Sequence, residues 1–88
     1  MKQILLFYQK WCPYCKKAFA WMNELKKEHP EYAEVPLETV DENAEKERAD
    51  SYDYYYVPTF YLDGKKIHEG VASKEIIEGI FKKALEDR

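Results

Sequence analysis

Two cysteines separated by two residues, Cys12 and Cys15, stand where an apolar run meets a helical pattern. The run 4–8 is continuously apolar, which is typical of a strand buried on both faces. From residue 16 to residue 29 apolar residues recur at helical spacing, and Pro13 suits a first helical turn. The cysteines therefore lie at a strand-to-helix junction. Unpaired N–H groups and the helix dipole favour negative charge there, so a thiol ionises more easily.

The composition predicts one domain over residues 1–88, with eight tyrosines, four phenylalanines and two tryptophans for its core. A net charge of −3 argues against a nucleic-acid or membrane-surface binder. The first apolar run is too short for a signal peptide and no cleavage site follows it. We therefore expect a cytoplasmic monomer. In a reducing compartment a lone cysteine pair is catalytic or metal-binding rather than structural.

The rest of the chain completes the order β-α-β-α-β-β-α. A strand over 35–40 follows the first helix, so it should run parallel to the first strand. Asn43 is the expected N-cap of a short charged helix over 44–51. Asp63-Gly64 predicts a type I′ turn between antiparallel strands over 59–62 and 65–68.

The last segment predicts a helix that Ser73 caps. Its apolar stripe consists of Ile76, Ile77, Ile80, Phe81, Ala84 and Leu85. Gly79 lies within this helix, which we interpret as allowing close packing on the sheet.

Two motifs carry a family resemblance: Cys12-Pro13-Tyr14-Cys15 near the N-terminus, and Val57-Pro58-Thr59 before the hairpin. With this order of elements the whole chain resembles a glutaredoxin, a member of the thioredoxin superfamily. Trp11, Lys16 and the segment 70–74 are instead similar to thioredoxin, so the resemblance is to a small glutaredoxin-like redoxin with thioredoxin-like features. It implies an α/β thioredoxin fold, with a four-stranded mixed sheet flanked by three helices.

The chain also departs from both family patterns. Glu69 stands where glutaredoxins usually carry the first of two glycines. Ala72-Ser73 falls at the pair that holds the γ-glutamyl end of glutathione, but without the aspartate. The buried aspartate of thioredoxin and its partner lysine fall at Leu6 and Leu37.

The position of the cysteines predicts their roles. Cys12 precedes the helix and should be the exposed nucleophile, whereas Cys15 lies one turn in and should be the resolving thiol. The resemblance implies that Pro58 is a cis-proline facing them. Proline has no N–H, so the backbone of Val57 is left to pair with an extended substrate.

Further residues are expected to contact the substrate or glutathione. Lys10 is the candidate partner of the glycyl carboxylate of glutathione, and Ser73 falls at the γ-glutamyl end. Trp11 and Tyr14 are expected to form an apolar rim that faces the substrate, and Tyr56, just before Val57, is expected to lie beside the site. Lys16 and Lys17 either add positive potential or are ordinary solvated lysines.

The leading hypothesis is a thiol–disulfide oxidoreductase that reduces protein or glutathione mixed disulfides. The C-P-Y-C tetrapeptide favours glutathione as co-substrate, with no bound cofactor and no metal ligands; a thioredoxin-like reductase fed by thioredoxin reductase is the alternative. A second class is an iron–sulfur or zinc scaffold. It usually needs four ligands, so a dimer or glutathione thiols would have to complete the two cysteines. A third is a non-catalytic binding module.

Overall fold

The computed structural model describes residues 1–86, which form a four-stranded mixed sheet in the order β2-β1-β3-β4. β1 (Ile4–Tyr8) pairs in parallel with β2 (Leu37–Asp41) and antiparallel with β3 (Thr59–Leu62). β3 pairs antiparallel with β4 (Lys65–Glu69). The predicted order of elements and the mixed sheet are confirmed.

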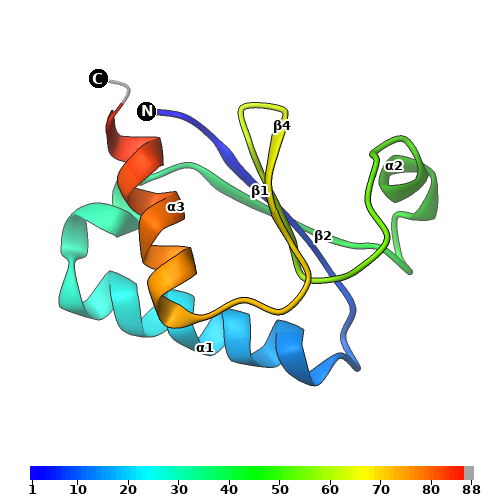
Figure 1. Cartoon of the computed structure of the whole chain (residues 1–88), viewed down its shortest axis with the longest axis horizontal. Helices are drawn as coiled ribbons and strands as arrows, with labels where there is room; N and C mark the ends of the chain where they lie inside the picture. Colours follow the sequence, from blue (N-terminus) through cyan, green and yellow to red (C-terminus); the bar gives the residue numbers. More distant parts are fainter. Residues whose placement is uncertain (87–88) are drawn as a thin grey trace.

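Helices cover both faces of this sheet. Figure 1 shows α1 (Pro13–Glu28) and α3 (Lys74–Glu86) side by side, while α2 (Lys46–Asp50) lies apart from them, beside the loop that leads to β3. A short 3₁₀ turn, η1 (Pro30–Glu34), follows α1 and was not predicted. No helix within residues 1–86 has the length and apolar character needed to cross a membrane.

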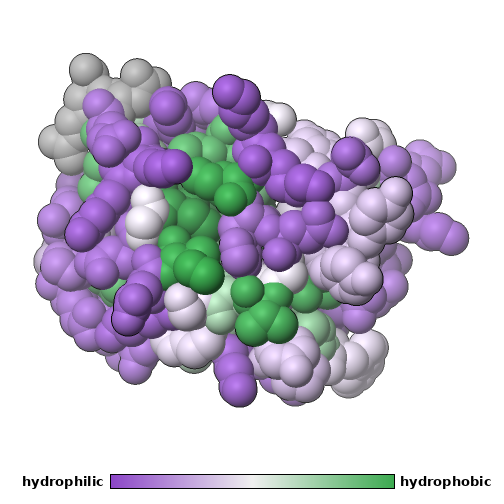
Figure 2. All heavy atoms as spheres, viewed as in Figure 1, coloured by the Kyte–Doolittle hydropathy of each residue, from purple (hydrophilic) through white to green (hydrophobic). Residues whose placement is uncertain are grey.

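β1 is buried on both faces because its side chains alternate between two cores. Ile4 and Leu6 pack against α1 and α3, whereas Leu5 and Phe7 pack on the α2 side. This explains why the run is apolar without alternation. An apolar strip reaches the surface between α3 and the β4 side of the sheet (Figure 2).

The start of α2 differs from the prediction. The backbone N–H of Asn43 donates to Asp41 Oδ1 at 2.9 Å, so this segment forms a turn rather than a cap. The helix begins at Lys46, with Glu45 at the N-cap. The competing Asx turn accounts for a helix shorter than expected.

Turn and cap predictions at the other end of the chain hold. Asp63 (φ 49°) and Gly64 (φ 82°) form the expected hairpin turn. Ser73 caps α3, because its Oγ accepts from the N–H of Ile76 at 3.1 Å. The interpretation of Gly79 is wrong: apart from its chain neighbours and the adjacent backbone of α3, a Cβ atom there would meet nothing within 4 Å, so close packing does not require this glycine.

Candidate active site

Cys12 and Cys15 occupy the first turn of α1, in different surroundings. Cys12 is the N-cap and is half-buried, while Cys15 is 1% exposed. The carbonyl of Cys12 accepts from the N–H of Cys15 and from that of Lys16, both at 3.1 Å. The helix therefore starts between the two thiols, which sets one at the surface and the other beneath it.

The segment before β3 faces Cys12. The Cys12 Sγ donates to the carbonyl oxygen of Val57 at 3.9 Å, and the Val57–Pro58 bond is cis. The Pro58 carbonyl in turn accepts from the N–H of Gly70 at 2.9 Å. The end of β1, the start of β3 and the end of β4 thus meet at one place.

The Cys15 thiol holds its proton strongly. Burial is the main cause that raises the pKa of Cys15 to about 12, and the Cys12 thiol and the negative charge of Glu42 act in the same direction. A hydrogen bond from the Gln9 backbone opposes them. At neutral pH Cys15 is therefore a neutral thiol.

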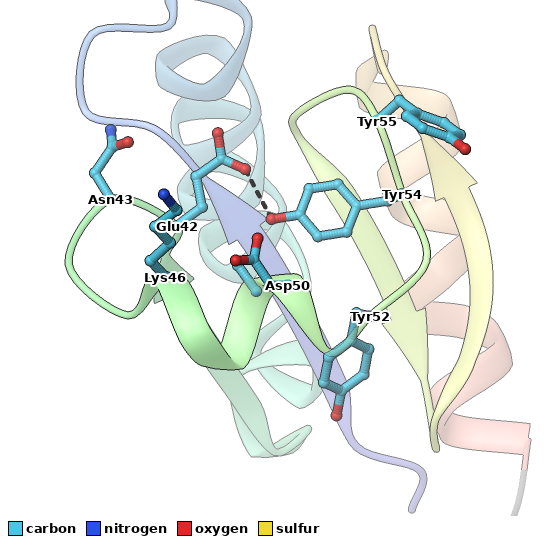
Figure 3. A pocket seen from close by; sticks show the side chains of 8 residues that line it. Glu42, Asn43, Lys46, Asp50, Tyr52, Tyr54 and Tyr55 are labelled. Atoms are coloured by element: carbon cyan, nitrogen blue, oxygen red, sulfur yellow. Dashed lines mark hydrogen bonds between the residues drawn. The ribbon is translucent and has the colours of Figure 1, made fainter.

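Glu42 is a part of the site that the sequence analysis missed. It directly follows β2, and its Oε1 accepts from the Tyr54 hydroxyl at 2.7 Å, as Figure 3 shows, while Oε2 accepts from the side-chain amide of Gln9. Burial and this carboxylate raise the pKa of Tyr54. Glu42 also lines a surface pocket with Lys46 and Asp50. The sequence did hold a signal for Glu42. It follows a strand predicted to run parallel to β1, so it lies at the edge of the sheet where β1 ends.

The match to known proteins decides the family. The thioredoxin family model matches residues 1–86. The chain belongs to the thioredoxin family. Thioredoxin-fold homologues are thiol–disulfide oxidoreductases, so this thioredoxin-family protein is a redox protein with a dithiol centre. No curated protein sequence matches the chain closely enough to count as a relative.

Solved structures agree with this assignment. Fasciola hepatica thioredoxin is 27% identical, with a TM-score of 0.67 over 92% of this chain and 79% of the other. Mitochondrial thioredoxin 3 from Saccharomyces cerevisiae is 26% identical, with a TM-score of 0.71 over 93% and 77%. A structure titled as a malarial protein is 22% identical, with a TM-score of 0.74 over 97% and 98%, and shows the fold alone. The thioredoxin superfamily predicted from the sequence is confirmed; its glutaredoxin branch stays a prediction.

The residues expected around the substrate have different surroundings. Trp11 (80% exposed), Tyr14 (48%) and Tyr56 (70%) present large apolar surfaces, and Val71 (61%), which was not predicted, adds another. Lys10, Lys16 and Lys17 are exposed as well. In this thioredoxin-family chain, Ser73 uses its Oγ to cap α3. Its role toward glutathione remains a prediction.

The residues that the structure describes contain no group of three or more His, Cys, Asp or Glu arranged to hold a metal ion. A cluster or zinc site in this thioredoxin-family chain would therefore have to draw ligands from outside residues 1–86, such as a second copy or glutathione thiols.

Proposed function

We propose that the protein is a reductase of protein disulfides in which Cys12 attacks and Cys15 resolves. The observation that supports this is the contrast between a half-buried thiol at a helix N-cap and a buried thiol one turn behind it. A thiol that is partly exposed where negative charge is favoured suits attack. A protonated thiol within the helix suits the later, intramolecular step.

The proposed reaction has two exchanges. The Cys12 thiolate attacks one sulfur of the substrate disulfide, forms a mixed disulfide and releases the other sulfur as a thiolate. Cys15 then loses its proton and attacks the Cys12 sulfur, which releases the second substrate thiol and leaves a Cys12–Cys15 disulfide. Two electrons pass to the substrate, and an external reductant restores the dithiol.

The substrate would be an extended backbone bound beside Val57. Its carbonyl oxygen faces Cys12 Sγ, and Pro58, which follows, has no N–H to compete for partners. Trp11, Tyr14 and Tyr56 expose apolar rings that suit contact with a polypeptide. The proposed setting is a reducing cytoplasm, with the chain acting as a monomer.

For the electron donor we favour a thioredoxin reductase. The solved structures above are named thioredoxins, and the Ser73 hydroxyl already accepts the capping bond of α3. Glutathione is the second candidate. The C-P-Y-C tetrapeptide and the exposed Lys10 beside it favour that donor.

The deciding experiment measures reduction of the oxidised protein with NADPH and thioredoxin reductase, and separately with glutathione, NADPH and glutathione reductase. We expect faster reduction by the first system, followed by turnover of insulin disulfides. Cys12→Ser is the control and should be inactive with both donors. Reduction by glutathione alone would assign the protein to the glutaredoxins, and failure with both would reject the proposed reductase.

A further inference from the structure

Glu69, at the end of β4, holds the loop that precedes Val57. Its Oε2 accepts from the backbone N–H of Tyr55 at 2.6 Å and from that of Tyr56 at 3.0 Å. Its Oε1 accepts from Lys66 Nζ at 2.7 Å. Both oxygens of one carboxylate are thus engaged, and two consecutive amides of the loop converge on one of them.

The two tyrosine side chains next to Val57 do little to fix this loop. The side chains of Tyr55 and Tyr56 are 85% and 70% exposed, so packing contributes little to holding them. Figure 3 shows Tyr55 directed away from Tyr54, which points toward Glu42. Hydrogen bonds to an ionised acceptor are stronger than neutral ones, so the carboxylate is a strong restraint on the backbone amides of residues 55 and 56.

This restraint reaches the residue that faces Cys12. The Tyr56 carbonyl accepts from the hydroxyl of Thr59, and the Pro58 carbonyl accepts from the N–H of Gly70, the residue after Glu69. Val57 therefore lies between one segment tied to Glu69 and another tied to Gly70. A shift of Glu69 would move the Val57 carbonyl relative to Cys12 Sγ.

We infer that Glu69 is a positioning residue, which fixes the bent Tyr56–Pro58 segment in the form that directs the Val57 carbonyl toward Cys12 Sγ. The inference rests on the proposed function, because it assigns Val57 to substrate binding. The inference also assigns a role to Glu69 at the position where glutaredoxins usually carry a glycine. In this chain the Glu69 carboxylate positions the Tyr56–Pro58 segment through backbone hydrogen bonds and does not contact the substrate itself.

The test compares Glu69→Ala and Glu69→Gln with the unchanged protein in insulin reduction, using whichever donor supports turnover. Glu69→Ala removes the two charge-assisted hydrogen bonds to the loop amides together with the one to Lys66, and it should raise KM by about tenfold and change kcat less than about twofold. Glu69→Gln keeps the volume and one acceptor oxygen, so its KM should rise by about threefold. Glu34→Gln removes the same charge from η1, at the far end of α1, and should change neither constant.

Amide hydrogen exchange gives a readout that global destabilisation would not mimic. Exchange at Tyr55 and Tyr56 should accelerate in Glu69→Ala while the amides of β1 keep their protection. An unchanged KM in both Glu69 variants, or a kcat loss without a KM rise, would overturn the inference while leaving the reductase intact. A wild-type protein that reduces no disulfide would reject the proposed function first, and this inference with it.

Discussion

Cys12 and Val57 come from segments 45 residues apart in sequence, yet Cys12 Sγ lies 3.9 Å from the Val57 carbonyl oxygen. The sheet register explains the contact. Phe7, near the end of β1, is opposite Thr59 at the start of β3, so the loop after β1 and the loop before β3 leave the sheet at the same edge. The pairing of β1 with β3 therefore assembles the site. The loop after β1 brings the Cys12 thiol, and the loop before β3 brings Val57 and Pro58.

The first prediction concerns trapping. Cys15→Ser should accumulate a mixed disulfide between Cys12 and a protein substrate, because attack proceeds but nothing resolves the product. Mass spectrometry under non-reducing conditions would detect the adduct, and dithiothreitol should remove it. Cys12→Ser is the matched control and should form none. Equal trapping by both variants would contradict the assignment of Cys12 as nucleophile.

Alkylation should separate the two thiols. Burial raises the pKa of Cys15 to about 12, so near neutral pH this thiol is protonated, and Cys15 should react with iodoacetamide only after denaturation. In a Cys12→Ser background, Glu42→Gln removes a negative charge that raises this pKa, and labelling at pH 9 should become faster. Rapid labelling of Cys15 in the native protein would disprove its buried state.

Acid should destabilise the fold through Glu69. Hydrogen bonds from Lys66 and from the backbone of Tyr55 and Tyr56 lower the pKa of its carboxyl to about 2. An unfolded glutamate titrates near pH 4.3, so the ionised form stabilises the fold above that pH, and the stabilisation is lost as pH falls toward 2. Urea unfolding from pH 7 to pH 2 should show a smaller loss of stability in Glu69→Gln than in the wild type. Identical pH profiles would refute the link.

The parts of the fold and of the site that could be predicted from the sequence are those that depend on residues close together in the chain. The apolar run of β1, the cysteines at a helix start and the Asp63-Gly64 turn are short-range patterns, and the structure agrees with each. Glu42 and Glu69 were not recognised as parts of the site, because the partners that connect them to it (Gln9 and Tyr54 for Glu42, Tyr55 and Tyr56 for Glu69) are 12 to 33 residues away and meet them only after the sheet forms. The prediction that Asn43 caps α2 was wrong for the opposite reason. Two local preferences competed there, and the Asx turn formed by Asp41 prevailed over the cap.

Phe7 should contribute most to the stability of the core on the α2 side of the sheet, beneath Tyr52 and Tyr54. It is fully buried, and its ring centroid lies 4.8 Å from that of Tyr52 and 4.9 Å from that of Tyr54. Phe7→Ala should lower the free energy of unfolding by about 3–5 kcal/mol, as expected for a buried phenylalanine. Phe19→Ala, which truncates a half-buried ring on α1, is the matched control and should cost clearly less. Urea titration at pH 7 measures both, and equal losses would contradict a central role for Phe7.

Replacing Trp11 and, separately, Trp21 by alanine should distinguish substrate binding from fold stability, because one tryptophan is exposed and the other packs against the core. Trp11 is 80% exposed next to Cys12, whereas Trp21, on α1, is half-buried and packs against the larger core cluster. Trp11→Ala should leave the free energy of unfolding within about 0.5 kcal/mol. It should raise KM for a protein disulfide by about fivefold to tenfold, because an aromatic anchor of the rim is lost. Trp21→Ala should do the reverse, lowering stability while KM stays unchanged at a temperature where the variant is folded. Thermal unfolding and insulin reduction on the two variants provide the comparison, and a Trp11 variant with wild-type KM would remove the apolar rim from the substrate site.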